Sequence, residues 1–436
     1  MQLFSTKRES PEVGFEEAIF RGLPPDNGLY MPDHIPVLGK DFWDGADQLS
    51  FQEIAFEMAN ALLSDEVPAA DLKSIVDQAI NFPAPLVRVE ENIYCLELFH
   101  GTSMAFKDFG ARFMAATMSY FLQKSNRKIN ILVATSGDTG GAVAQGFFGV
   151  PNITVTILYP KGKVSDIQEK QLTTLGNNVR ALEIDGTFDD CQALVKQAFL
   201  DEDLRSKFNL ASANSINIAR LIPQSFYYAQ AYASLKKLGL PLVFSVPSGN
   251  FGNLCAGILA WKMGMPVKKF IAATNLNKVV PEYLSTGEYR PISPSVSTIS
   301  NAMDVGNPSN FPRMYELFDR NIEVMRAHVY STYYDDEQTK ASIKDLYDHH
   351  QYLACPHTAI AYRGLKEYQK TEKEEFSGVF LSTAHYAKFL PEMEAVLQMK
   401  PDIPERLQGL LSKTKVAESL STEYQEFKTY LSDHLS

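Results

Sequence analysis

The sequence predicts an α/β protein with two βα lobes, parallel-rich sheets and an N-terminal helical segment. From about residue 128, short apolar stretches that suit strands alternate with amphipathic stretches that suit helices, as in βαβ units. Before residue 81, helical stretches are separated by loops that contain proline and glycine. A chain of 436 residues is also too long for one comfortable core, so two or more packed lobes are expected.

The expected elements follow in chain order. Helices are expected at 15–21, 51–64, 70–80 and 111–122. Strands are then expected at 128–135, 152–159, 179–184, 242–246 and 269–274, and helices at 140–149, 166–175, 189–199 and 254–263. The charged, amphipathic tail, 404–436, is expected to form helices on the outside. We expect an N-terminal segment (1–95) packed on the larger lobe, a smaller α/β lobe (96–225), and a larger α/β lobe with the C-terminal helices (226–436).

The composition excludes several classes of protein. A formal net charge of −11 argues against nucleic-acid binding, which needs a basic face, but allows a small anionic substrate. The cysteines (Cys95, Cys191, Cys255 and Cys355) are scattered and lack zinc spacing, so neither a disulfide framework nor a metal site is expected. No signal peptide and no apolar stretch long enough to span a membrane are found. We therefore expect a cytoplasmic protein without membrane partners.

A first motif, Glu97-Leu-Phe-His-Gly-Thr-Ser-Met-Ala-Phe-Lys-Asp-Phe-Gly110, places Lys107 between Phe106 and Phe109, just before an expected helix. A lysine that aromatic residues shield from water has a lowered pKa, as an amine that reacts with a carbonyl requires. The alternative is a lysine at the end of a helix that pairs with Asp108 and lies along apolar surface.

Two glycine-containing turns follow expected strands, the place where α/β sheets bind ligands. In the turn Ala134-Thr-Ser-Gly-Asp-Thr-Gly-Gly-Ala142, small residues and a helix N-terminus suit a substrate carboxylate; the alternative is a helix cap by Ser136, Asp138 or Thr139. In Ser245-Val-Pro-Ser-Gly-Asn-Phe-Gly-Asn-Leu254, Gly249 and Gly252 bracket a loop rich in backbone donors. Such a loop binds phosphate or is an ordinary tight turn. Neither a dinucleotide fingerprint nor a P-loop is present.

Two further segments carry polar residues in apolar surroundings. In Asn214-Ser-Ile-Asn-Ile-Ala-Arg220, Asn217 and Arg220 are expected on one helical face, where they suit a phosphate or carboxylate; the alternative is a surface arginine. In Val379-Phe-Leu-Ser-Thr-Ala-His-Tyr-Ala-Lys388, a buried strand ends in hydroxyls that contact a ring nitrogen or only satisfy the backbone. Together with Lys107 and the two turns, these segments suggest a phosphate-bearing carbonyl cofactor, and pyridoxal phosphate fits that description.

These segments resemble those of the threonine synthase family, in its longer bacterial and fungal branch. The resemblance covers almost the whole chain. It includes the N-terminal stretch FSTKRESPEVGFEEAIFRGLPPDNGLYMPDHIP and, in order, HGTSMAFKDFG, ATSGDTGGAVA, NSINIAR, VPSGNFGN, PHTA and STAHYAKF. The resemblance implies the fold-type-II, tryptophan-synthase-like architecture of pyridoxal-phosphate enzymes.

The resemblance also implies roles for individual residues. Lys107 would bind the cofactor aldehyde and then act as the mobile acid and base. Asp138 would lie near the 3′ oxygen of the cofactor, and Thr383 would bond to its pyridine nitrogen. The cofactor phosphate would be held by Gly249, Asn250, Phe251, Gly252 and Asn253. Ser136 and Thr139 would bind the substrate carboxylate; the leaving phosphate would be bound by Asn214 and Arg220, supported by Ser215 and Asn217.

The implied reaction is a β,γ-replacement that converts O-phospho-L-homoserine and water into L-threonine and phosphate, by a monomer or small homo-oligomer. Alternatives are a related phospho-lyase that releases a 2-oxo acid, a serine/threonine dehydratase, or a non-catalytic scaffold. The sequence departs from the usual family pattern at Thr102, Ser103 and Met104, at Tyr386, where proline is usual, and at Cys355, where aspartate is frequent. None of these departures removes a residue with an implied catalytic role, but Tyr386 puts the geometry of its loop in doubt.

Overall fold

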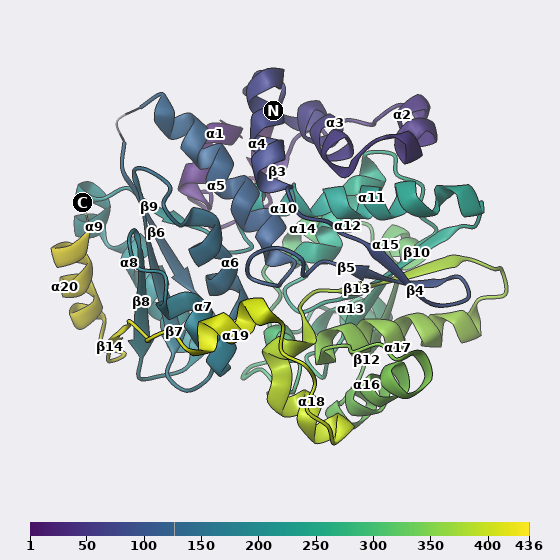
Figure 1. The fold of residues 1–436 in the computed structure, drawn as a ribbon. Coiled ribbons are helices and arrows are strands. Elements are labelled where there is room, and N and C mark those ends of the chain that lie inside the picture. The colour runs from purple at the N-terminus through teal and green to yellow at the C-terminus, as the bar shows by residue number, and fades with distance from the viewer. Residues whose placement is uncertain (126, 436) are drawn as a thin grey trace.

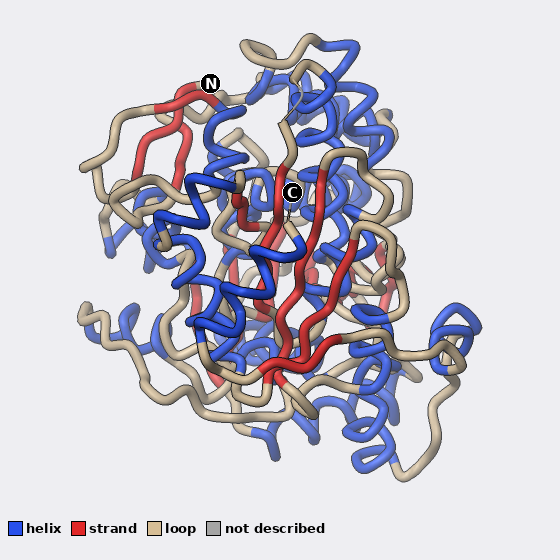
Figure 2. Tube along the Cα trace, turned by 90° about the vertical axis from the view of Figure 1, so that its left-hand side faces the viewer, coloured by secondary structure: helices blue, strands red, loops and turns tan. Residues whose placement is uncertain are grey.

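The computed structural model describes residues 1–125 and 127–435 and contains two large sheets, each in its own lobe (Figure 1). This arrangement confirms the predicted α/β class with parallel-rich sheets. Figure 2 shows the strands running through the middle of the molecule, with helices around them. Strands β6 (Ile129–Ala134) and β10 (Leu242–Pro247) are buried along their whole length, as expected for parallel strands covered on both faces.

The smaller sheet is wholly parallel and has the strand order β14-β8-β7-β6-β9. Its other strands are β7 (Ile153–Pro160), β8 (Val179–Ile184), β9 (Leu210–Ser212) and β14 (Glu418–Leu420). Its helices are α5 (Lys107–Gln123), α6 (Asp138–Phe147), α7 (Asp166–Thr173), α8 (Phe188–Leu200) and α9 (Glu202–Lys207). The strands and helices predicted in this region are therefore confirmed.

The larger sheet has the order β12-β11-β10-β13-β5-β4 and is parallel except for the β4–β5 hairpin. Its other strands are β4 (Leu86–Glu90), β5 (Ile93–Glu97), β11 (Lys269–Thr274), β12 (Val329–Tyr333) and β13 (Ser377–Ser382). The helices are α10 (Ile218–Leu221), α11 (Gln224–Leu235), α12 (Gly252–Lys262), α13 (Val279–Thr286), α14 (Phe311–Leu317), α15 (Ile322–His328), α16 (Asp336–His350), α17 (Pro356–Thr371) and α18 (Leu390–Leu397).

The N-terminal segment contains the three predicted helices and a small antiparallel sheet that was not predicted. The predicted helices are α1 (Phe15–Arg21), α3 (Phe51–Leu63) and α4 (Ala69–Ala79), and a further helix, α2 (Lys40–Gly45), was not predicted. The sheet contains β1 (Gln2–Ser5), β2 (Val13–Gly14) and β3 (Tyr30–Pro32). Helix α3 begins with a capping box between Ser50 and Glu53. It packs on α11, whereas α4 packs on α5 and α1 lies against β9, so this segment contacts both lobes.

The C-terminal tail crosses from one lobe to the other, because α19 (Glu405–Leu411), β14 and α20 (Tyr424–His434) lie on the smaller lobe (Figure 1). We had expected these residues within the larger lobe. The apolar face of α20, with Phe427 and Leu431, instead joins the buried cluster that contains Leu182 and Leu194. No helix in the described ranges is long and apolar enough to cross a bilayer.

Candidate active site

A cavity of about 1870 Å³ opens where the carboxyl ends of β6, β10 and β13 lead into loops. Ligands bind at such edges in parallel sheets. Nearly every residue predicted for the site lines this cavity: Lys107, Ser136, Asp138, Thr139, Asn214, Ser215, Arg220, Gly249, Asn250, Phe251, Gly252, Asn253 and Thr383. The exception is Asn217, which is absent from the lining.

Lys107 is the first residue of α5, one turn earlier than the predicted start of the helix, and it lines the cavity. Burial lowers the pKa of Lys107 from its usual 10.5 to about 8. The carboxylate of Asp138 opposes this shift, and the positive charges of Arg220 and Lys388 add to it. Asp108 is not an ion-pair partner of Lys107: its carboxylate accepts a bond from Ser103 N at 2.8 Å. The amine is therefore suited to nucleophilic chemistry near neutral pH.

The loop before Lys107 is bound to the segment that follows β13. Phe106 N donates to Thr383 O at 2.8 Å, His385 N donates to Met104 O at 3.1 Å, and Ala105 forms a bridge with Ala384. The side chain of Thr383 lines the same cavity, and no hydrogen bond to its hydroxyl is formed within the described parts of the chain. These backbone bonds fix the position of the Lys107 amine relative to the Thr383 hydroxyl.

In the turn after β6, the side chain of Thr135 accepts hydrogen bonds from the free backbone N–H groups at the start of α6. Thr135 Oγ1 accepts hydrogen bonds from Gly137 N at 3.0 Å and Gly140 N at 2.8 Å. The alternative of a cap by Ser136, Asp138 or Thr139 is therefore wrong, because α6 has no side-chain cap from its N-cap position and Thr135 takes these donors. Ser136 and Thr139 are part-buried at the cavity wall, which leaves their hydroxyls available for a ligand.

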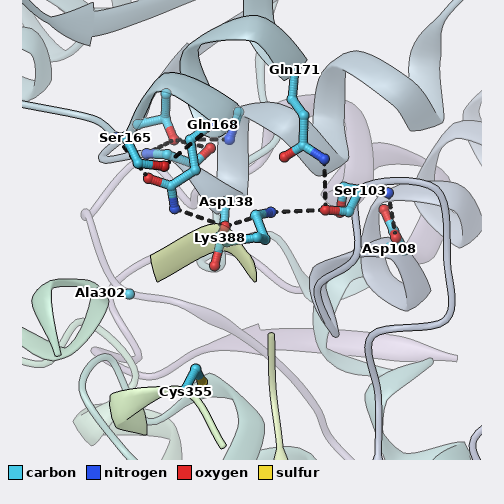
Figure 3. Close-up of polar contacts among 12 residues, drawn as sticks. Ser103, Asp108, Asp138, Ser165, Gln168, Gln171, Ala302, Cys355 and Lys388 are labelled. Carbon is cyan, nitrogen blue, oxygen red and sulfur yellow. Dashed lines mark hydrogen bonds and ion pairs between the residues drawn. The ribbon is translucent and has the colours of Figure 1, made fainter. Parts of the chain in front are cut away.

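Asp138 is buried and bonded on one oxygen by two side chains. Its Oδ1 lies 2.6 Å from Lys388 Nζ and accepts a hydrogen bond from Gln168 Nε2 at 2.9 Å (Figure 3). Burial by itself would raise the pKa of Asp138, but the charges of Lys388 and Lys107 outweigh it and hold the pKa well below its usual value. Neither Lys388 nor Gln168 was predicted. The only signal for Lys388 was its position between the apolar residues Ala387 and Phe389.

The loop between β10 and α12 contains consecutive backbone N–H groups that are available to a ligand. Among the described residues, the backbone N–H groups of 249–252 have no acceptor within the chain. Phe251 adopts φ of 61°, a strained conformation typical of functional turns. A Cβ on Gly249 would lie 2.6 Å from Met303 Cα, so only glycine fits there. Such donors at the N-terminus of a helix bind phosphate.

Asn250 and Asn253 are held by neighbouring side chains. Asn250 Nδ2 donates to Ser215 Oγ at 2.6 Å, which connects the phosphate-type loop to the 214–220 segment. Asn253 Oδ1 accepts from Tyr227 at 2.6 Å and from Tyr228 at 2.8 Å. Its Nδ2 is buried without a partner among the described residues, and this donor remains for a ligand.

Arg220 is a buried cation at the cavity that makes no ion pair within the described chain. Its guanidinium donates to Ala213 O at 2.5 Å and weakly to Lys107 O at 3.5 Å, and its Nε has no partner. Burial lowers the pKa of Arg220 to about 10, so it stays charged at neutral pH. The alternative of a surface arginine is wrong, because Arg220 is only 2% exposed. A buried, uncompensated charge of this kind favours an anionic ligand.

Asn217 does not share a helical face with Arg220, as we had predicted, because the helix starts at Ile218 and Asn217 is its cap. Its Oδ1 accepts from Ala219 N at 3.1 Å, and its Nδ2 donates to Ile19 O at 2.8 Å and to Ser212 O at 3.2 Å. Asn217 thus supports the segment from behind and does not face the cavity.

His357 is a buried residue of the cavity wall for which we had predicted no role. Its Nε2 accepts a hydrogen bond from Ala302 N at 3.3 Å, which requires the neutral ring with its proton on Nδ1. Burial lowers the pKa of His357 to about 4.

Cys355 stands at the N-cap position of α17, but its side chain does not bond to the backbone N–H groups of the helix. Its sulfur contacts Thr358 Oγ1 at 3.2 Å, and this hydroxyl lies 3.0 Å from Ser382 Oγ. The replacement of aspartate by cysteine is thus accommodated by a hydroxyl network.

The matches to family models agree with this geometry. The model described as "Pyridoxal-phosphate dependent enzyme" matches residues 79–401, and the model described as "Threonine synthase N terminus" matches residues 2–80. The fold and the site are therefore those of a pyridoxal-phosphate enzyme.

Individual relatives narrow the assignment. The threonine synthase of Haemophilus influenzae is 45% identical over 432 residues, which cover 99% of each chain. The crystal structure of threonine synthase from Escherichia coli superposes with a TM-score of 0.93 at 43% identity, covering 100% of both chains. That of PLP-bound threonine synthase from Brucella melitensis gives a TM-score of 0.94 at 34% identity, covering 100% of this chain and 99% of the other. The chain belongs to the threonine synthase family.

The residues present fit pyridoxal phosphate on structural grounds. The free N–H groups of 249–252 match a phosphate, the unpaired Thr383 hydroxyl matches a ring nitrogen, and Lys107 supplies an amine with a lowered pKa. All three groups line one cavity. Pyridoxal phosphate is the cofactor of this enzyme class.

Proposed function

We propose that the chain converts O-phospho-L-homoserine and water into L-threonine and inorganic phosphate, the last step of threonine biosynthesis. The observation that carries this proposal is the buried guanidinium of Arg220, which has no carboxylate partner among the described residues and lies in the cavity that also contains Lys107. A cofactor-binding lysine alone fits many reactions of amino acids. A second anion site beside it fits a substrate that carries a phosphate of its own.

The cofactor is proposed to be held at three points. Lys107 binds its aldehyde covalently through the amine. The backbone and side chains of Gly249, Asn250, Phe251, Gly252 and Asn253 hold its phosphate. Thr383 bonds to the pyridine nitrogen, and Asp138 lies near the 3′ oxygen. The free donors of 249–252 and the free Thr383 hydroxyl support these assignments.

The substrate is proposed to lie between the two anion sites. Ser136 and Thr139, at the N-terminus of α6, hold the carboxylate with their hydroxyls and the local backbone donors. Arg220 and Asn214 hold the phosphate, with Ser215 fixed by Asn250 at 2.6 Å. Asn217 contributes only by supporting this segment through its bonds to Ser212 and Ile19.

The chemistry divides between the cofactor and the chain. When bound, pyridoxal phosphate would supply an electron sink for the negative charge that is left at Cα of the substrate. Lys107, once its amine is free, takes protons from Cα and Cβ and returns protons to Cγ and Cα, while water adds the hydroxyl group at Cβ and its second proton goes to the phosphate. A positioned proton-transfer group of this kind contributes about 10²–10⁴-fold. Arg220 and Asn214 stabilise the negative charge that develops on the phosphate as it leaves Cγ. Ser136 and Thr139 orient the substrate so that these atoms are within reach of Lys107.

The experiment is to incubate the purified, cofactor-loaded protein with O-phospho-L-homoserine and to measure threonine, phosphate and 2-oxobutanoate together. Equal amounts of threonine and phosphate are expected. Phosphate with 2-oxobutanoate would instead indicate a phospho-lyase, and the absence of all products would favour a scaffold. A cytoplasmic location and a monomer or small homo-oligomer remain predictions.

A further inference from the structure

Lys388 is a completely buried lysine beside the cofactor site. It lies in the short helix η4 (Tyr386–Phe389), which follows the Thr383 segment, and its side chain has no exposed surface. Its Nζ is 2.6 Å from Asp138 Oδ1 and donates to Ser103 O at 2.8 Å (Figure 3). A buried ammonium needs such partners, because the loss of hydration is otherwise not offset.

Lys388 joins three walls of the site. Asp138 begins α6 of the smaller lobe, Ser103 belongs to the loop before Lys107, and Lys388 itself follows β13 of the larger sheet. Helix α7 supports both contacts from behind: Gln168 Nε2 donates to Asp138, and Gln171 Nε2 donates to Ser103 O at 2.9 Å. The position of the Asp138 carboxylate is therefore fixed by groups from both lobes.

The Asp138 carboxylate also acts on Lys107. It favours the charged form of the Lys107 amine, whereas Lys388 favours the neutral form. Within the described residues no ion pair joins Lys107 to Asp138, and Oδ1 of this carboxylate is paired with Lys388. An amine must be unprotonated to attack an aldehyde. A carboxylate that paired with Lys107 would hold the proton on the amine and block this attack.

We propose that Lys388 is a positioning residue, whose ion pair occupies Asp138 and so keeps this carboxylate from pairing with the amine of Lys107. The inference rests on the proposed role of Lys107 as the amine that binds the cofactor. Lys388 acts through Asp138 and Lys107, without contact with the cofactor or the substrate. The other titratable groups that act on this cluster come from several elements. They are Asp108 on α5, Arg220 on α10, Cys355 and His357 at the start of α17, and His385 directly before η4.

The test is to follow by absorbance the attachment of pyridoxal phosphate to the apoprotein as a function of pH. In Lys388→Met, the pH midpoint of attachment should rise, and the dissociation constant at neutral pH should increase by about tenfold, because Asp138 then turns to Lys107. In Lys388→Met/Asp138→Asn, the midpoint should return to the wild-type value or below it, because no carboxylate holds the proton. Lys388→Arg keeps the charge and should keep the midpoint.

A matched control is Lys415→Met. Lys415 also joins the C-terminal part of the chain to the smaller lobe, through ion pairs with Glu169 at 2.8 Å and Glu183 at 2.5 Å, but it lies outside the cavity lining. Its loss should leave the midpoint unchanged. If Lys388→Met does not fold, Lys388→Gln replaces it, because the amide can donate to Ser103 O in the buried site but has no charge to offset that of Asp138.

Two results would overturn the inference. One is an unchanged midpoint in a folded variant that lacks the charge of Lys388. The other is a raised midpoint that persists in the double variant, which would show that Lys388 acts without Asp138. The assay uses no amino-acid substrate, so the two proposals fail separately. Cofactor attachment without threonine formation would contradict the proposed function alone, and an unchanged midpoint in an active enzyme would contradict the role of Lys388 alone.

Discussion

The backbone N–H of Phe106 donates a hydrogen bond of 2.8 Å to the carbonyl oxygen of Thr383. This contact joins the loop that presents Lys107 to the end of β13, so the amine and the Thr383 hydroxyl keep a fixed distance. Both groups belong to segments with several further backbone bonds, including the one from His385 N to Met104 O. Fixed geometry of this kind is what orientation of a cofactor between two groups requires.

Replacement of Lys107 tests the central assignment. In Lys107→Ala, the absorbance of covalently bound cofactor should disappear, and kcat should fall by about 10²–10⁴-fold, because the proton-transferring amine is lost. Absorbance spectra and threonine formation measure the two effects. Lys163→Ala is the matched control, because Lys163 lines the same cavity but is exposed at its rim. Intact absorbance and turnover in Lys107→Ala would contradict the proposed role of Lys107.

Gly249 tests the proposed phosphate loop. A Cβ at this position would lie 2.6 Å from Met303 Cα, so Gly249→Ala must displace the backbone of the loop and its donors. The dissociation constant for pyridoxal phosphate should increase by about tenfold or more, as for the loss of charge-assisted bonds. Gly39→Ala is the control, because a Cβ there has open space and φ is −60°. It should leave cofactor binding unchanged.

The sequence predicted the central strands of both sheets and the longer helices of the smaller lobe because their patterns are local, whereas the long helices α11, α16 and α17 were not predicted. β6 and β10 are continuous apolar stretches followed by glycine-containing turns. Several short strands were missed because they depend on distant partners. β14 is short, mostly exposed and charged at its first residue, and it exists because it pairs with β8. The same is true of the small N-terminal sheet, in which β1 pairs with β3.

The sequence predicted most of the residues that line the site, but not all of the contacts that these residues make. Lys107, Arg220 and Thr383 line one cavity because their motifs follow strands whose carboxyl ends meet. Asn217 was assigned to the wrong face, since the helix begins one residue after it. Lys388 was missed because a lysine is exposed by default, and only the folded chain brings Asp138 to it.

Arg220 should distinguish the phosphate from the rest of the substrate. In Arg220→Ala, kcat/KM for O-phospho-L-homoserine should fall by about 10²-fold, since a bond to a charged group contributes about 1.5–3 kcal/mol. Binding of L-homoserine, which lacks the phosphate, should change much less. Arg127→Ala is the control: Arg127 also lines the cavity but is paired with Glu16 at 2.9 Å and is partly exposed. Equal losses for both ligands would count against the assigned role.

Tyr386 stands where the family usually has proline, and its effect on the loop is testable. Its hydroxyl donates to Asp402 O at 2.9 Å at the surface, and its ring packs beside His385. Tyr386→Phe should therefore lower the free energy of unfolding by no more than about 1 kcal/mol and leave kcat unchanged. Urea unfolding and steady-state rates measure this. A large loss of kcat would show that the hydroxyl has a role in the reaction.

His357 should make the apoprotein sensitive to acid. Its pKa is about 4 in the folded chain and 6.5 in the unfolded chain, so the unfolded chain binds the extra proton between these values. The stabilisation is complete above pH 6.5 and is lost as the pH falls towards 4. Between pH 7 and pH 5 this residue should account for a loss of about 2 kcal/mol in the free energy of unfolding.

The physical cause is burial, which withholds water from the charged ring; protonation of Nε2 would also remove the acceptor for Ala302 N. Urea unfolding of the apoprotein at the two pH values measures the effect, and His357→Gln should remove that part of the difference. His385, whose pKa burial also lowers to about 4, remains in both proteins and cancels in the comparison. An equal pH dependence in the variant would show that His357 is not the group that titrates.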